Sequence, residues 1–149
     1  MIEQLDRFVR KDRDLVTAKP EDTARQAAQR MAETDVGCLI VLGQNGELAG
    51  VVTEKDLVHK VLARGRQIDD VTVREIMSTD VVTCDTNVPV YRAGEMMARR
   101  GARHLPILDK GKVVGMVSSR DIIAHEIALV QKQAQKRYDA LRQDKLQVP

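Results

Sequence analysis

One short stretch, Gly50-Val51-Val52-Thr53-Glu54-Lys55-Asp56, occurs a second time as Gly115-Met116-Val117-Ser118-Ser119-Arg120-Asp121. Each copy runs from apolar residues to a hydroxyl residue and then to an Asp, and a helical pattern follows each Asp. Such a strand-to-helix corner can cap a helix, or it can present a hydroxyl and a carboxylate to a polar ligand. The choice between these two roles decides what the protein does.

The corner belongs to a longer internal repeat. Asp14-Leu15-Val16-Thr17 aligns with Asp80-Val81-Val82-Thr83 at an offset of 66 residues (80 − 14), and the two corners align at 65 (115 − 50). One extra residue near Gln44-Asn45 accounts for the change of offset. Because the register holds over most of each copy, we interpret the repeat as a true duplication.

Each copy predicts the element order β-α-β-β-α, and therefore an α/β (α+β) fold. In the first copy we expect strands at 15–17, 37–42 and 48–53. A capping box at Thr23 starts the first helix, and the second helix covers 56–64. The second copy repeats this scheme.

In the second copy, Pro89 falls in the first turn of a helix, and the hairpin strands lie at 105–108 and 113–117. The predicted divisions are an N-terminal amphipathic helix, a first unit, a linker packed on the surface, a second unit and a C-terminal helical extension. They cover residues 1–13, 14–65, 66–79, 80–130 and 131–149.

The composition excludes several classes of protein. The 149 residues are 43% apolar, which suits a globular core, but only 2% aromatic, which leaves little for base stacking. A net charge of +2 argues against bulk electrostatic binding of nucleic acid, although the C-terminal tail is basic. No apolar run is long enough to span a membrane, and the charged N-terminus is unlike a secretory signal, so we expect a cytoplasmic protein.

Catalytic and metal-binding patterns are not visible. Cys38 and Cys84 lie among apolar residues and are expected to be small buried thiols. The three histidines are too scattered for a metal centre, and no nucleophile accompanies a recognisable base. We therefore expect neither an enzyme nor a metalloprotein.

The last helix lacks a glycine stop, and its apolar face continues at three- and four-residue steps. This face consists of Ile123, Ile127, Val130, Ala134, Tyr138 and Leu141. It outruns what one small unit can cover. An arm for a dimer or another partner is favoured over a solvated extension.

These residues resemble the CBS domain family, whose domains pair into the Bateman module. The resemblance rests on the two corners and on Arg103-His104-Leu105-Pro106-Ile107-Leu108-Asp109, and it covers roughly residues 14–130. It implies two units packed sheet to sheet about a pseudo-twofold axis, often in homodimers. It also implies clefts that bind AMP, ADP or ATP, or with less support S-adenosylmethionine or NAD(H). No cofactor is required, and the regulated partner protein stays unidentified.

The resemblance implies that Asp56 and Asp121 bind the ribose of such a ligand, and that Thr53 and Ser118 contact its sugar or phosphate. A carboxylate that accepts from two directions suits two adjacent ribose hydroxyls. Adenine would lie between the opening strand and the second strand of each unit. The neighbouring positions are Val16, Val36, Gly37 and Cys38 in the first unit, and Val82, Ala102, Arg103, His104 and Met116 in the second.

The two sites should be unequal. Arg103, His104 and Arg120 offer phosphate ligands in the second unit, whereas the first unit offers Lys55 and has Gly37-Cys38 in place of Arg103-His104. Lys55 and Arg120 can equally be ordinary surface charges. The sequence therefore favours a nucleotide sensor whose main site is in the second unit. The alternative is a nucleotide-free interaction protein that acts through its dimer and its C-terminal helix.

Overall fold

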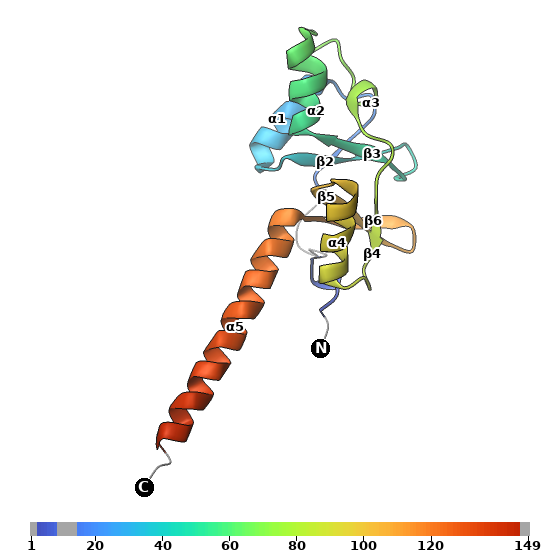
Figure 1. Ribbon diagram of the computed structural model, residues 1–149. Helices are drawn as coiled ribbons and strands as arrows, with labels where there is room; N and C mark the ends of the chain where they lie inside the picture. The colour runs from blue at the N-terminus through green and yellow to red at the C-terminus, as the bar shows by residue number, and fades with distance from the viewer. Residues whose placement is uncertain (1–2, 9–14, 147–149) are drawn as a thin grey trace.

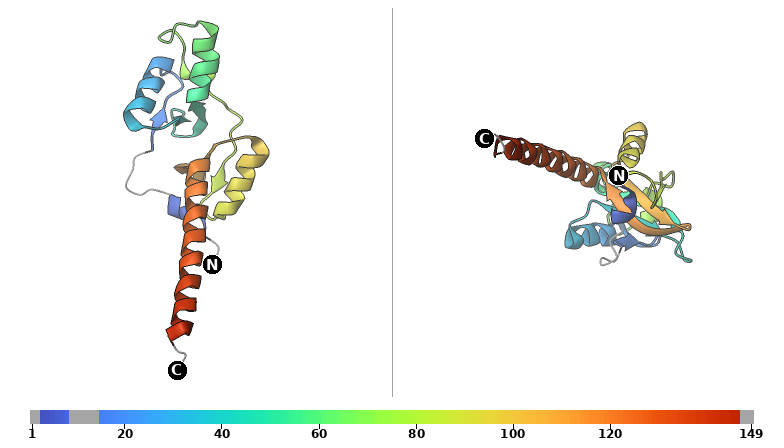
Figure 2. Two further views of the ribbon diagram at one scale, coloured as in Figure 1. Left: turned by 60° about the vertical axis from the view of Figure 1, so that its left-hand side comes forward. Right: turned by 90° about the horizontal axis from the view of Figure 1, so that it is seen from below.

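The computed structural model describes residues 3–8 and 15–146, and it confirms the α/β fold with two three-stranded sheets. Figure 1 shows two units of similar construction stacked on each other, with the hairpin of one sheet next to that of the other. The last helix leaves the second unit and projects well beyond it (Figures 1 and 2).

The first unit contains a sheet in the order β1-β2-β3, with β1 parallel and β3 antiparallel to β2. Its elements are β1 (Thr17–Ala18), α1 (Ala24–Thr34), β2 (Cys38–Leu42), β3 (Leu48–Thr53) and α2 (Glu54–Asp56). Helix α2 continues as a π-helical turn, η2 (Leu57–Val61), and a 3-10 turn, η3 (Leu62–Arg64). Gly65 ends this helix at φ 62°, a conformation that glycine adopts without strain.

The second unit repeats the sheet as β4-β5-β6. Its elements are β4 (Cys84–Asp85), α4 (Val90–Arg100), β5 (His104–Asp109), β6 (Lys112–Ser118) and α5 (Ser119–Leu146). Pro89 is the residue before α4 rather than part of its first turn. The opening strands also begin later than expected, because only Thr17 and Ala18 pair in register with β2.

The capping box predicted at Thr23 is confirmed. The Thr23 hydroxyl accepts from the Gln26 N–H at 3.1 Å, and the Gln26 side chain accepts from the Thr23 N–H at 2.8 Å. These bonds satisfy two N–H groups that the first turn of α1 would otherwise leave unpaired. A short local signal is therefore enough to place the start of α1.

The segment that precedes each unit in the sequence packs on the other unit. The turn η1 (Leu5–Phe8) lies on the second unit, where the Leu5 N–H donates to the Val88 carbonyl at 2.9 Å. Helix α3 (Val73–Ile76) lies on the first unit, where the Val73 N–H donates to the Asp22 carbonyl at 2.8 Å. Asp22 and Val88 are equivalent in the repeat (88 − 66 = 22), so the two contacts obey the pseudo-twofold symmetry.

Residues 66–79 pack more deeply than the linker expected on the surface. Val71, Val73 and Ile76 are almost completely buried in the core of the first unit, with Leu39, Val41 and Val52. The amphipathic helix expected over residues 1–13 is a single 3-10 turn within residues 3–8. Two of its expected apolar positions, Ile2 and Val9, lie outside the described residues.

Gly50, the first residue of the repeated stretch, makes room for this segment. Residue 51 exchanges two hydrogen bonds with Ser78, at 3.0 and 2.9 Å, and a Cβ on Gly50 would lie 2.5 Å from the Ser78 carbonyl oxygen. We therefore expect Gly50→Ala to lower the free energy of unfolding by about 1–3 kcal/mol, measured by urea denaturation.

Gly94→Ala is the matched control. A Cβ on Gly94, within α4, would meet the Ile122 Cγ2 atom at 3.4 Å, which is ordinary contact. Alanine is also the better helix former by about 1 kcal/mol. A Gly50→Ala variant as stable as Gly94→Ala would contradict the close approach of Ser78.

Candidate functional site

The corner of the second unit joins β6 to α5. The Ser118 N–H and hydroxyl donate to the Asp121 Oδ2 atom at 2.8 and 2.7 Å, and the Ser118 Oγ atom accepts from the Asp121 N–H at 3.2 Å. Among the described residues, the second carboxylate oxygen, Oδ1, has no hydrogen-bond or ion-pair partner. Asp121 therefore caps the helix with one oxygen and leaves the other without a partner among the described residues.

The corner of the first unit has the same capping geometry but a different charge environment. Asp56 Oδ2 accepts from the Thr53 N–H and hydroxyl, both at 2.9 Å. Its Oδ1 atom lies 2.7 Å from the Lys60 Nζ atom, which also donates to the Ile76 carbonyl. Both oxygens of this buried carboxylate are thus engaged, so a ribose would have to displace Lys60.

The pseudo-equivalent of Lys60 is His125 (60 + 65 = 125), and it does not face Asp121. Its ring is buried, and its Nε2 atom lies 3.2 Å from Glu3 Oε2, on the segment that precedes η1. Of two equivalent positions in the repeat, Lys60 therefore contacts Asp56, whereas His125 contacts Glu3 instead of Asp121.

His104 lies within electrostatic range of both corners. It begins β5 and pairs in register with Ser118, the capping residue of the second corner. Burial lowers the pKa of its imidazole, the Asp121 carboxylate opposes that shift, Arg103 adds to it, and Glu54 opposes it. Since Asp121 belongs to the second unit and Glu54 to the first, charges of both units influence the pKa of His104.

Glu54 and Lys60 are site residues that the sequence interpretation missed. The Glu54 carboxylate lies against Gly37, where an added Cβ would be 3.1 Å from its Cδ atom, and the Glu54 N–H donates to the Gly37 carbonyl at 3.0 Å. This negative charge stands where the first corner would need cations for a phosphate. Lys60 had a visible signal, because a Lys four residues after an Asp lies on the same helix face.

The other predicted residues lie around their own corners. Arg103 is tied to the second corner because its carbonyl accepts from the Ser119 N–H at 2.9 Å, and Met116 lies opposite Pro106 in the hairpin. Arg103, Arg120 and Lys55 are exposed and form no ion pair with another described residue. The remaining predicted positions are half-buried: Val16, Val36, Gly37 and Thr53 in the first unit, and Val82, Ala102 and Ser118 in the second.

The thiols of Cys38 and Cys84 are buried, as expected. Burial raises the pKa of Cys38 to about 12 and that of Cys84 to about 11. Cys38 therefore contributes a small apolar side chain and its main chain, not a reactive sulfur.

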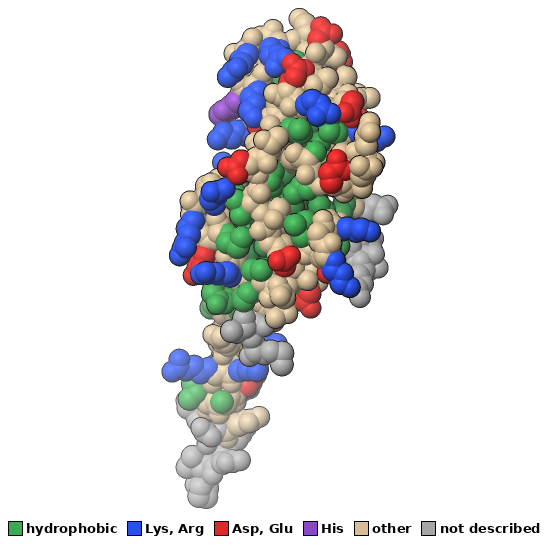
Figure 3. Space-filling view, turned by 90° about the vertical axis from the view of Figure 1, so that its right-hand side faces the viewer, with side chains coloured by type: hydrophobic (Ala, Val, Ile, Leu, Met, Phe, Trp, Pro, Cys, Tyr) green, Lys and Arg blue, Asp and Glu red, His purple; other side chains and the backbone are tan. Residues whose placement is uncertain are grey.

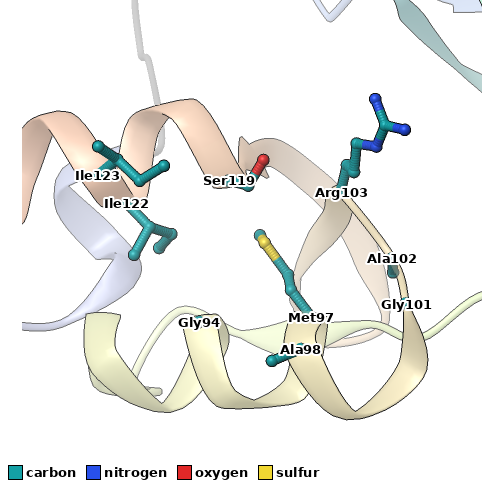
Figure 4. Close-up of a pocket in the computed structure, with 9 residues that line it drawn as sticks. All are labelled: Gly94, Met97, Ala98, Gly101, Ala102, Arg103, Ser119, Ile122 and Ile123. Atoms are coloured by element: carbon teal, nitrogen blue, oxygen red, sulfur yellow. The ribbon is translucent and has the colours of Figure 1, made fainter.

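The structure has a hollow in each unit. One of about 400 Å³ lies between α4 and α5, and one of about 520 Å³ adjoins Val16 and Arg30. Neither is lined by Asp56 or Asp121. Figure 4 shows the Arg103 side chain pointing out of the first hollow, whereas Met97 and Ile122 point into it. The hollow between α4 and α5 is thus mostly apolar, and it borders the second corner at Arg103 and Ser119.

Within residues 3–8 and 15–146, no three potential metal ligands form a cluster. Over the same residues, the structure has no helix that combines the length and the apolar character needed to cross a bilayer.

Protonation of His104 gives a testable pH dependence. A lowered pKa in the folded state means that unfolding takes up a proton once the pH falls below the ordinary value of 6.5. The stability that neutral His104 provides is present above that pH and is lost as the pH falls toward the folded-state pKa. We expect the free energy of unfolding to decrease from about pH 7 to about pH 5.5, and to decrease less in His104→Gln. Urea denaturation of both proteins at both pH values checks this. An equal change in the free energy of unfolding in the wild type and in His104→Gln would contradict it.

Taken together, the geometry defines a tandem pair of α/β units related by pseudo-twofold symmetry. In one capped corner the Asp keeps an oxygen unpaired among the described residues, and in the other the Asp is paired with a lysine. The model of the CBS domain family matches residues 9–63 and 73–127. The chain belongs to the CBS domain family and carries two tandem copies of the domain.

Relatives of the chain occur in distant organisms. An uncharacterized protein of Methanopyrus kandleri is 39% identical over 119 residues, which are 79% of this chain and 61% of the relative. The CBS domain-containing protein YhcV of Bacillus subtilis is 32% identical over 114 residues, 76% of this chain and 80% of that protein. The chain thus spans less than two thirds of the first relative and most of the second.

Solved structures share the fold. The CBS-domain containing protein ATU1752 from Agrobacterium tumefaciens is 28% identical, with a TM-score of 0.77 over 83% of this chain and 99% of that one. PAE2072 from Pyrobaculum aerophilum, complexed with AMP, is 25% identical, with a TM-score of 0.72 over 80% of this chain and 89% of that one. The CBS domain pair of protein MJ0100, in complex with 5′-methylthioadenosine and S-adenosyl-L-methionine, is 25% identical. Its TM-score is 0.77 over 86% of this chain and 98% of that one.

Proposed function

We propose that this protein is a regulatory sensor that binds an adenine nucleotide, AMP, ADP or ATP, at the corner of its second unit. The observation that carries the proposal is the contrast between the two carboxylates: Asp121 keeps one oxygen free beside exposed cations, whereas Asp56 is neutralised by Lys60. The adenosine-containing ligands named for the structures of PAE2072 and MJ0100 support this class of ligand.

Each part of the nucleotide has a matching set of groups. The free Oδ1 of Asp121 accepts from the ribose hydroxyls, and the exposed guanidinium groups of Arg103 and Arg120 bind the phosphates with His104. Adenine lies against the small and apolar positions Val82, Ala102 and Met116. The first corner, with Thr53, Lys55 and Asp56, is a weaker second site.

The regulatory step follows from the position of His104 between the units. A phosphate beside Arg103 neutralises a charge that disfavours imidazolium, so binding is coupled to the protonation of His104 and to its attraction to Glu54. A ligand shifts the packing of the units, or of α5, only through its different affinity for the two states. A partner protein reads that shift, and the module needs no catalytic group.

Thermal unfolding of the purified protein with AMP, ADP, ATP and GMP tests the proposal. At a ligand concentration about 100 times the Kd, binding to the folded state adds about 2.7 kcal/mol of stability, which is a clear rise in Tm. We expect at least one adenine nucleotide to raise Tm and GMP not to. If no adenine nucleotide changes Tm, the sensor proposal fails. The mass of small molecules that co-purify with the protein identifies the ligand.

A second candidate function is a nucleotide-free interaction protein, and the observation that favours it is the exposed apolar side chains along α5. The same side chains support a homodimer in either case. The two functions separate in the thermal experiment, because an interaction protein gains nothing from a nucleotide.

A further inference from the structure

Helix α5 has an apolar face that no described residue of the chain covers. Figures 1 and 2 show that most of this 28-residue helix projects away from the two units. Its large apolar side chains are more than half exposed, at Ile123, Ile127, Val130, Tyr138 and Leu141. Its opposite side is anchored near the base by the buried residues Ile122 and His125. Figure 3 shows hydrophobic and cationic side chains together on the projecting part.

The spacing of this face repeats every eleven residues. Ile123, Ile127 and Val130 recur as Ala134, Tyr138 and Leu141. Eleven residues in three turns are 3.67 per turn, close to the 3.6 of an undistorted helix, so the face runs nearly straight along α5. One straight helix can therefore cover it from end to end.

The face is complementary to itself when two copies run in opposite directions about residue 132. Ile123 and Leu141 are each nine residues from that centre, and Val130 and Ala134 are each two residues from it. Each large side chain near the centre then meets a small one. The same alignment sets Glu126 of one copy beside residues 137–138 of the other, where Arg137 carries the opposite charge.

A parallel alignment lacks both advantages. It sets Ala134 against Ala134, which leaves a gap, and it sets Arg137 against Arg137, which repels. The antiparallel alignment is isologous, as the interface of a twofold dimer must be.

The base of α5 provides a second, independent feature. In the antiparallel alignment, Leu141 of the second copy arrives beside Ile123 of the first. Ile123 borders the apolar hollow of about 400 Å³ between α4 and α5, with Gly94, Met97 and Ile122 among its other walls (Figure 4). Because Ile123 belongs to both, the apolar face of α5 and the hollow form one continuous surface. A leucine side chain is the kind of group that such an apolar hollow accommodates.

We propose that two copies of this chain associate through an antiparallel pair of α5 helices, with Leu141 of each copy seated at the α4–α5 hollow of the other. The proposal specifies the homodimer of the proposed function. The proposal rests on the homodimer part of the proposed function, and it does not depend on nucleotide binding.

Sedimentation equilibrium of the full chain tests the interface. We expect the wild type to be dimeric and Leu141→Asp to raise the dissociation constant at least tenfold, because the new carboxylate would be buried twice in the symmetric interface. Gln143→Asp, on the opposite side of the same helix, is the matched control and leaves the dimer intact. A monomeric wild type, or a Leu141→Asp dimer as tight as the control, overturns the proposal.

Cysteine cross-linking tests the direction of the pair. Ile123→Cys and Leu141→Cys are prepared separately and oxidised alone and mixed. Antiparallel helices give a disulfide-linked dimer in the mixture only, because positions 123 and 141 of a parallel pair are roughly 27 Å apart. Cys38 and Cys84 are buried and do not interfere. Cross-linking of each variant with itself overturns the antiparallel arrangement. A normal nucleotide response in monomeric Leu141→Asp shows that the two proposals succeed or fail separately.

Discussion

Asp121→Ala is expected to abolish the rise in Tm that adenine nucleotides cause in the wild type, while the variant remains folded. In the proposed site the free Oδ1 atom of Asp121 accepts from the ribose, and hydrogen bonds to a charged group contribute about 1.5–3 kcal/mol each. Loss of two such bonds weakens binding on the order of 100-fold. Isothermal titration calorimetry with the nucleotide that co-purifies measures the change.

Asp56→Ala is the matched control, because it removes the same carboxylate from the other copy of the corner. Both variants lose a helix cap that is worth about 1 kcal/mol. Asp56→Ala also leaves Lys60 without its ion-pair partner, so we expect it to be the less stable variant and yet to bind nucleotide normally. Equal loss of binding in both variants would show that the two corners act together. Unchanged binding in Asp121→Ala would reduce the second corner to a helix cap.

Leu5→Ala is expected to lower the free energy of unfolding by about 2–5 kcal/mol, as the truncation of a fully buried leucine does in other cores. Leu5 is only the first residue of η1, but its side chain is completely buried in the core of the second unit beside Val90, Leu105 and Val117. Urea denaturation measures the loss. Because the cavity is in the second unit, nucleotide binding at the second corner should weaken as well.

Asp6→Ala is the control for this prediction, because Asp6 belongs to the same turn and its side chain is exposed. Its effect on stability should stay within about 0.5 kcal/mol. If Leu5→Ala also changes stability by less than about 1 kcal/mol, the turn is only loosely attached to the second unit.

Much of the fold could be predicted because it is encoded locally. The hairpin strands, the Thr23 capping box and the end of the helix at Gly65 each follow from a few neighbouring residues. The duplication then supplied the second unit. The same local signals predicted Ser118 and Asp121 as capping residues, and the structure shows both bonds. The assignment of ligand roles to these residues stays a prediction.

The missed features depend on contacts between distant segments. The mixed pattern of residues 66–79 shows that its apolar side chains need a partner, but not that the partner is the core of the first unit. Glu54 was overlooked because its importance comes from the approach of Gly37 and His104, which no spacing in the sequence reveals. The ion pair between Lys60 and Asp56 distinguishes two corners that look equivalent as sequence.

The reciprocal packing of η1 and α3 has a consequence for synthesis of the chain on the ribosome. The core of the first unit stays incomplete until Ile76 has been made, and Leu5, which is made before either unit, has no core to enter until β5 and β6 exist. Contacts of such long sequence separation form late. The first unit can therefore complete its core from residues 16–77 alone, whereas the second core closes only after Ile122 has left the ribosomal tunnel, and Leu5 must wait until then.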